Sequence, residues 1–239
     1  MNYYTTRAFV LKKEIAEEKD NVYHFFTQDF GKINLKAKSS RDILAKLKGH
    51  LEVPTLVQIN FSLTYQPRLI SALEEEPYLN IKNNDAALSA ALRIGQLVDE
   101  LTLLNQKDLE IFTLLSETLY FLDRNLSKSP QLIDFSWFYF EAQFLKLLGY
   151  EPFLTACVKC AKKDVHYFSF TERGVVCNLH YHQEDLPITA NQRKTLQLLF
   201  NISLRQVDTI KIITQILKEK RFLEEFLSRF TLRVKSDIM

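Results

Sequence analysis

The N-terminal third of the chain carries the residue pattern of short β-strands. Apolar and polar residues alternate in Lys32–Ala37, and the turn signal Asp29–Gly31 joins this segment to a preceding aromatic run, which predicts a hairpin. Five strand-like segments follow one another here: Thr5–Lys13, Asn21–Thr27, Lys32–Ala37, Glu52–Leu63 and Arg68–Leu73. This series predicts a small closed β-barrel, which leaves no sheet edge exposed. The segment Asp42–Lys48 is compatible with a short helix or a loop.

From about Asn84 onward the apolar residues recur with the period of an α-helix. Three stripes are expected to form a helical core: Leu88, Leu92, Gly95 and Val98; Leu109, Phe112, Leu115, Leu119, Leu122 and Leu126; and Ile133, Trp137, Phe140, Phe144 and Leu148. Asn84 or Asp85 is a suitable N-cap for the first helix and Asp108 for the second, and Gly149 suits the position that follows the third. We expect Trp137 to pack in this core, because no polar cleft residues are interleaved with the stripe.

Two more helices are predicted near the C-terminus. Thr189 and Gln192 have the spacing of a capping box, which would open a helix through Ile202. Asp208 is expected to open another helix, whose apolar side would carry Ile212, Ile216, Leu223, Phe226 and Phe230. The fold class is therefore α+β, with a β-barrel followed by helices.

Composition excludes several classes of protein. The 239 residues are 46% hydrophobic and 25% charged, which is ordinary for a globular chain, and the formal net charge is only +2. With five glycines the chain has neither of the glycine-rich phosphate-binding motifs. No secretory signal and no apolar stretch of membrane-spanning length is found, so we expect a cytoplasmic protein with no membrane partner.

All three cysteines lie in the pattern Cys157-x-x-Cys160, sixteen residues, Cys177-x-x-His180. Two such turns facing each other supply the four ligands of a structural zinc ribbon, and the intervening segment is typical of a hairpin that would bring Cys177 back beside Cys160. Four protein ligands leave no position for a reactive water, so one structural Zn²⁺ is expected rather than a catalytic ion.

Two alternatives remain for this cysteine cluster. His182 or His166 could be the fourth ligand in place of His180, or the three cysteines could be free thiols without a metal. The motifs of zinc deaminases, serine hydrolases and zinc proteases are absent, so we expect no catalytic residues and a protein that is not an enzyme.

A cluster of positive charge lies on the predicted barrel. Residues 32–48 hold six bases and one acid, Asp42, which gives a local net charge of +5; the bases are Lys32, Lys36, Lys38, Arg41, Lys46 and Lys48. Barrels of the OB type bind single strands in a basic groove with aromatic stacking platforms, for which Tyr23, Phe25, Phe26 and Phe30 are candidates. Alternation places Tyr23 and Phe25 on one face and Phe26 on the other, so one face could be exposed. A solvated basic loop above an aromatic core is the alternative.

Three stretches of the chain also follow the pattern of a known family. They are Arg7–Lys12 with Glu18–Asp20 and Phe26–Lys32; Phe140–Glu141 through Leu148–Tyr150 and Pro152 to Cys157-x-x-Cys160; and Phe168–Ser169 through Gly174–Cys177. In order and spacing they resemble the RecO family of bacterial recombination mediators. Members commonly have four cysteines at the metal site, whereas this chain has His180 in the fourth place.

The resemblance implies four regions: an OB-fold DNA-binding domain (1–80), the first part of a helical domain (81–150), a zinc-ribbon insertion (151–186) and the C-terminal part of the helical domain (187–239). It implies a non-enzymatic mediator of DNA repair and homologous recombination, associated with the nucleoid, that binds single- and double-stranded DNA and anneals complementary strands.

The expected partners are RecR, the acidic C-terminal tail of the single-strand binding protein SSB and, indirectly, RecA. The SSB tail would need an apolar notch beside a cation, for which Arg124, Lys128 and Lys146 are candidates. A zinc-ribbon protein–protein adaptor without DNA binding is the alternative function.

Overall fold

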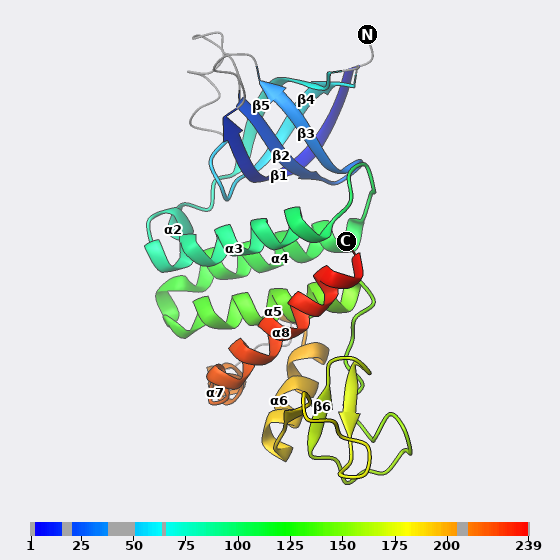
Figure 1. The fold of residues 1–239 in the computed structure, drawn as a ribbon. Helices are drawn as coiled ribbons and strands as arrows, with labels where there is room; N and C mark the ends of the chain where they lie inside the picture. Colours follow the sequence, from blue (N-terminus) through cyan, green and yellow to red (C-terminus); the bar gives the residue numbers. More distant parts are fainter. Residues whose placement is uncertain (1–2, 16–20, 38–50, 64–65, 205–209, 239) are drawn as a thin grey trace. The chain divides into compact units, whose positions relative to one another are not determined.

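The computed structural model describes residues 3–15, 21–37, 51–63, 66–204 and 210–238 (Figure 1). The chain divides into two compact units, Met1–Ile133 and Asp134–Met239. The first unit holds the barrel and its covering helices, and the second holds the cysteine cluster.

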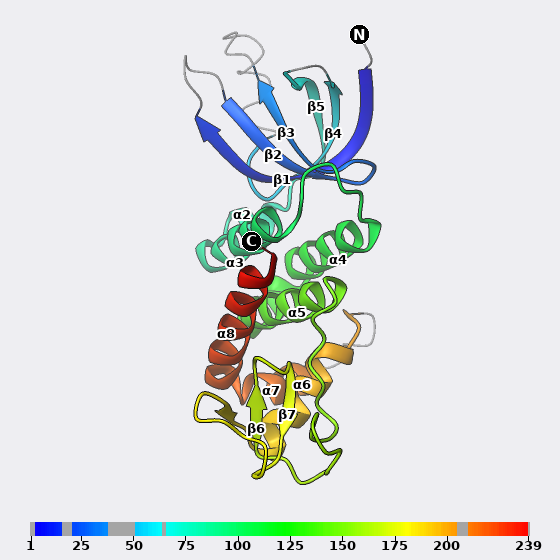
Figure 2. The same cartoon turned by 45° about the vertical axis from the view of Figure 1, so that its right-hand side comes forward.

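The first unit begins with the closed β-barrel that the strand pattern predicts (Figure 2). Its strands are β1 (Tyr3–Ile15), β2 (Asn21–Thr27), β3 (Gly31–Ala37), β4 (Leu56–Ser62) and β5 (Arg68–Glu76). They follow the order β1-β2-β3-β5-β4, and β4 pairs antiparallel with β1 to close the barrel. This five-stranded arrangement confirms the OB-type fold.

The middle of strand β1, Ala8–Leu11, is buried on both faces of the sheet. Ala8 and Val10 point into the barrel, where they meet aromatic side chains such as Phe25. The alternate residues Phe9 and Leu11 are equally buried on the outer side of the sheet. This continuous apolar run requires a covering layer outside the barrel, and the helices of the first unit supply it.

The helices of the first unit are α2 (Leu79–Lys82), α3 (Asp85–Leu101), α4 (Leu109–Asn125) and the 3₁₀ helix η2 (Leu126–Lys128). Both predicted N-caps are confirmed, because the side chain of Asn84 accepts from the Ala87 N–H at 3.0 Å and that of Asp108 from the Ile111 N–H at 3.0 Å. Helix α3 packs against β1 and β2.

The predicted apolar stripes of α3 and α4 are wrong in part. Leu92 is 45% exposed and Leu109 is 50% exposed, although both were expected in the core. The buried face of α3 is instead rich in small residues, including Ala87 and Ala91. A Cβ placed on Gly95 would lie 3.2 Å from the backbone oxygen of Leu11, so the helix approaches β1 too closely for larger side chains.

The second unit is built around α5 (Gln131–Leu147), which is buried on nearly every side. The elements that follow are β6 (Tyr167–Ser169), β7 (Gly174–Val176), β8 (Leu186–Pro187), α6 (Ala190–Asn201), α7 (Ile210–Leu217) and α8 (Lys220–Ile238). Trp137 is buried in the core as expected. Gly149 follows α5 with a φ of 85°, and the Thr189–Gln192 capping box is present. The predicted helix start at Asp208 lies outside the described residues. The single helix expected from there through Phe230 is wrong, because the chain forms two helices, α7 and α8.

Strands β6 and β7 form a hairpin that packs against α8 through aromatic rings. The ring of Phe168 lies 4.7 Å from that of Phe226 and 5.9 Å from that of Phe230, measured between centroids. Ring contacts of this kind stabilise beyond the area they bury. The hairpin and the last helix of the chain therefore share one core.

None of the helices within the described ranges is long and apolar enough to cross a membrane.

We expect Gly31→Ala to destabilise the first unit. Gly31 has a φ of 66°, a left-handed conformation that costs other residues about 1–2 kcal/mol. An added Cβ would also lie 1.8 Å from the backbone oxygen of Gln106. Gly149→Ala is the matched control, because Gly149 has the same handedness and no atom within 4 Å of the point where a Cβ would lie. Denaturant unfolding, read on the transition of the unit that holds each glycine, should show the larger loss for Gly31→Ala; equal losses would contradict the packing argument.

Candidate metal centre and nucleic-acid surface

Two tight turns bring the three cysteines and His180 together in the second unit. The first turn precedes β6 and is closed by the Cys157 N–H donating to the Lys162 oxygen at 2.8 Å, with Ala161 in a left-handed conformation. The second turn follows β7 and is closed by the His180 N–H donating to the Cys177 oxygen at 2.9 Å. The four potential ligand atoms all lie within 4.8 Å of one another.

The distances among these atoms fit a tetrahedral ion. The Cys160 and Cys177 sulfurs are 3.7 Å apart, and His180 Nδ1 lies 3.4 Å from the Cys177 sulfur and 3.6 Å from the Cys157 sulfur. A Zn²⁺ with Zn–S bonds of about 2.3 Å and a Zn–N bond of about 2.0 Å would set its ligands about 3.5–3.8 Å apart. Three soft thiolates and an imidazole are a donor set that zinc prefers. The residues present therefore fit the metal that the sequence pattern predicts.

Among the described residues, His180 is the histidine that joins the cluster. His166 instead lies with its Nε2 at 3.0 Å from a carboxylate oxygen of Asp164. The backbone N–H of His182 donates to the Asp185 carboxylate at 2.8 Å, and its ring is not part of the group. The geometry thus favours His180 as the fourth candidate ligand over His166 and His182.

The local environment shifts the pKa values of Cys157 and Cys160 in opposite directions. Burial opposes ionisation of Cys157, but backbone N–H groups, including those of Cys177 and Lys159, donate to its sulfur and lower its pKa to about 6. For Cys160, the N–H of Lys162 favours the thiolate, yet burial and the neighbouring thiols outweigh it and raise the pKa. Thiolates held this close together repel one another, and a bound cation would neutralise their charge.

Gly174 allows the hairpin to close against the first turn. A Cβ at this position would lie 2.5 Å from Cγ1 of Val158 and 2.9 Å from the backbone oxygen of Phe153. The Val158 N–H donates to the Val175 oxygen at 3.0 Å, which ties the turn to β7. The missing side chain at Gly174 therefore lets the two cysteine turns face each other.

In the first unit, the two described members of the predicted basic cluster, Lys32 and Lys36, lie on the outer face of β3. Strand register places Lys36 opposite Val22, and Lys32 opposite Phe26, so these lysines lie at opposite ends of β3. Lys38, Arg41, Lys46 and Lys48 lie outside the described residues, and their role stays a prediction.

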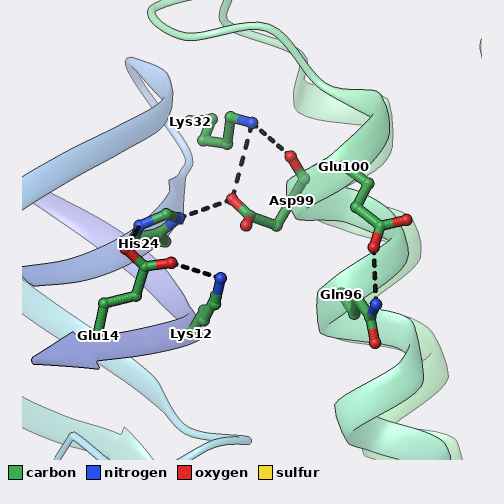
Figure 3. Close-up of polar contacts among 7 residues, drawn as sticks. All are labelled: Lys12, Glu14, His24, Lys32, Gln96, Asp99 and Glu100. Atoms are coloured by element: carbon green, nitrogen blue, oxygen red, sulfur yellow. Dashed lines mark hydrogen bonds and ion pairs between the residues drawn. The ribbon is translucent and has the colours of Figure 1, made fainter.

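The end of this face that holds Lys32 packs against α3 (Figure 3). Asp99 of α3 accepts from His24 Nδ1 at 2.9 Å, and the Lys32 ammonium donates to the backbone oxygen of Asp99. The Lys32 ammonium also lies 3.7 Å from the Asp99 carboxylate, and its side chain is only 13% exposed. Lys32 therefore has little surface left with which to contact a phosphate.

Of the two interpretations of the aromatic run, the structure contradicts exposed stacking rings and favours an aromatic core. Tyr23 and Phe25 are buried inside the barrel, and Phe26 is fully buried on the other face of β2. Phe30 packs edge-on against Phe61 at a centroid distance of 5.3 Å. A barrel this small uses all of its inward rings as core, and its outer face is covered at this end by α3.

Structure adds one cation that the sequence pattern missed. Arg68 of β5 is exposed and lies beside Lys36 in a short parallel pairing, reinforced by the Lys36 N–H donating to the Pro67 oxygen at 3.1 Å. Lys12 and Lys13 are exposed near the end of β1. No local signal joins Arg68 to Lys36, because only closure of the barrel makes these two strands neighbours.

The three candidate cations for an acidic peptide have different surroundings. Arg124 lies 3.5 Å from the Glu76 carboxylate and over the ring of Tyr120, and Lys128 lies in η2. Lys146 donates to Glu151 at 3.0 Å and to the Phe200 backbone oxygen at 3.1 Å. Beside it lies a pocket of 320 Å³, lined by Glu151, Pro152, Phe153, Leu154, Thr155, Gln197, Phe200 and Asn201.

Comparison with known proteins matches two family models to the chain. The model for "Recombination protein O N terminal" matches residues 1–75, and that for "Recombination protein O C terminal" matches residues 85–235. The boundary between the two matches falls between the barrel and α3, within the first structural unit.

Relatives described as DNA repair protein RecO match this chain over most of their own length. The chain is similar to the "DNA repair protein RecO" of Dehalococcoides mccartyi strain BAV1, with 29% identity over 90% of this chain and 85% of the relative. It is 25% identical to that of Acetivibrio thermocellus, over 96% and 94% of the two chains. Thermodesulfovibrio yellowstonii has a relative with 26% identity over 94% and 90%.

We expect His180→Ala to weaken zinc binding by more than the 10–100-fold that is typical of losing an outer-shell partner. The reason is that the imidazole occupies one of four converging positions. His182→Ala and His166→Ala are matched controls and should leave zinc affinity unchanged. His180→Cys should retain the ion, because a fourth thiolate completes the same tetrahedron. Competition with a chromogenic chelator measures all four; loss of the ion in His182→Ala alone would show that the assignment of His180 is wrong.

Proposed function

Because the chain belongs to the RecO family of DNA repair and recombination proteins, we propose that it binds single- and double-stranded DNA and anneals complementary strands as a mediator. The observation that supports this proposal is the closed OB-type barrel with two cations at one end, the half-buried Lys36 and the exposed Arg68. The basic segment that contains Lys38, Arg41, Lys46 and Lys48 continues directly from β3.

In this proposal the protein contacts mainly the phosphates of DNA and makes no contact that distinguishes one base from another. Tyr23, Phe25 and Phe26, the rings beside the basic strand β3, are buried and are not free to stack on bases as aromatics do in many single-strand binders. Lysine and arginine side chains attract the phosphate backbone of any sequence and release its counterions. Binding that ignores sequence suits a protein that must accept any pair of complementary strands.

Annealing follows from bringing two strands onto one cationic surface. Neutralised phosphates repel each other less, and strands held on the same protein meet at a high effective concentration. Neither effect requires covalent chemistry, so we propose that the protein is not an enzyme. The same proposal places it with the bacterial chromosome in the cytoplasm.

The proposed partners are RecR, SSB and, indirectly, RecA. For the acidic and apolar tail of SSB, the pocket beside Lys146 offers apolar lining from Phe153, Leu154 and Phe200 next to one ammonium group. Among the three candidate cations, Lys146 is the one that lies beside such a pocket, as far as the described residues extend. A tail carboxylate there would compete with Glu151 for the same ammonium.

In this proposal the metal is structural. Three thiolates and His180 would fill a tetrahedron around Zn²⁺, which leaves no coordination position for a substrate or water. The ion would tie the turn at Cys157 to the hairpin that packs on α8. Binding free energy of such an ion is folding free energy for the segment that holds it.

We expect the protein to accelerate annealing of complementary oligonucleotides coated with SSB at low salt. Omitting the protein sets the baseline, and non-complementary oligonucleotides control for aggregation. Strand pairing is followed by loss of donor fluorescence between labelled strands. A rate equal to the baseline would overturn the annealing proposal.

We expect Lys36→Glu and Arg68→Glu each to weaken single-strand binding and to reduce the slope of log affinity against log salt by about 0.7. With four to six phosphate contacts, the unmodified protein should lose affinity about 10²-fold between 50 and 200 mM salt. Lys107→Glu is the matched control, because Lys107 is exposed like Arg68 but lies near Asp29 at the opposite end of the β2–β3 hairpin. Unchanged affinity in both reversals would favour the adaptor function.

A further inference from the structure

The three thiols of the metal centre differ in their access to solvent. Cys157 and Cys177 are 2% and 4% exposed, whereas Cys160 is exposed at the tip of its turn. A metal-bound cysteine is held as a thiolate, which is the form that oxidants attack. Cys160 is therefore the sulfur of this cluster that a small oxidant reaches first.

Cys177 is the neighbour that could form a disulfide bond with an oxidised Cys160. The Cys160 and Cys177 sulfurs are 3.7 Å apart, and a disulfide bond needs about 2.0 Å. Cys160 lies on a tight turn in which the backbone oxygens of Cys157 and Lys162 both accept backbone hydrogen bonds. Closing the bond therefore requires the Cys160 sulfur, which lies on an exposed turn, to move toward the buried Cys177 sulfur.

We propose that Cys160 is a site of reversible oxidation by hydroperoxides, which forms a Cys160–Cys177 disulfide and expels the metal. The Cys160 thiolate attacks the O–O bond of the peroxide and becomes a sulfenic acid, with the other oxygen leaving as hydroxide or alkoxide. The Cys177 thiolate then attacks that sulfur and displaces hydroxide. The two sulfurs lose two electrons, and the peroxide gains them. This inference rests on the proposed metal centre.

Metal release follows from the loss of two ligands. The disulfide leaves only Cys157 and His180 of the original four donors, too few for a tetrahedral site. The binding free energy that stabilised the cysteine turns is then lost. A dithiol reductant would restore both thiols and, with zinc present, the site.

The consequence would extend to the last helix of the chain. Besides the contacts of Phe168, the hairpin turn holds α8 through Arg173, whose guanidinium lies 2.8 Å from the Asp237 carboxylate and 4.5 Å from the ring of Tyr150. Arg229 of α8 donates to the Glu184 backbone oxygen at 3.0 Å. Losing the metal thus loosens the surface on which α8 rests.

The test uses the full-length, zinc-loaded protein and hydrogen peroxide, with released zinc detected by a chromogenic chelator. Zinc content is measured first, so a chain that holds no zinc disproves the metal centre, and one that holds zinc but keeps it under peroxide disproves the oxidation. Peptide mapping of the released fraction should show Cys160 joined to Cys177 and Cys157 as a free thiol. A Cys157–Cys160 disulfide would overturn the proposed pairing.

A variant and a second measurement separate this chemistry from general damage. Cys160→His keeps four donors but removes the exposed thiolate, so peroxide should release its zinc at least about tenfold more slowly. Equal release rates would overturn the role of Cys160. Hydrogen exchange of α8 should rise on oxidation and fall again with reductant, while α3 in the other unit serves as the internal reference. Unchanged exchange in α8 would overturn the coupling to that helix.

Discussion

Burial of β1 on both faces is the constraint on which the first unit depends. Ala8 and Val10 fill the barrel while Phe9 and Leu11 need cover outside it, so α3 must lie close against the strand. That closeness selects glycine and alanine on the helix and places Asp99 within reach of His24 and Lys32 (Figure 3). A surface that other OB barrels leave open is thereby partly used as structure.

This arrangement bears on the proposed binding of DNA. The rings of Tyr23, Phe25 and Phe26 are committed to packing, and the cations Lys36 and Arg68 lie at the end of β3 away from α3. Charge without base contacts favours binding that is strong at low salt and indifferent to sequence. Those are the properties that strand annealing requires of a mediator.

The second unit depends on the packing of the β6–β7 hairpin against α8. Short strands such as β6 and β7 bury little surface by themselves, so the rings facing α8 keep the hairpin in place, and a metal ion bound by both cysteine turns would hold it more firmly. Of the four candidate ligands of that ion, Cys160 is the exposed cysteine, which is why the proposed oxidation begins there.

Local chemistry was sufficient to predict the strands, the N-caps at Asn84 and Asp108, the capping box at Thr189 and the spacing of the cysteine cluster, because each depends on residues a few positions apart. Tertiary structure alone decided the exposure of Leu92, the burial of Phe26, the pairing of Lys36 with Arg68 and the place of Asp99. These depend on how closely separate elements approach, which periodicity does not encode. His180 lies between the two cases: its spacing suggested it, and the closed hairpin selected it over His166 and His182.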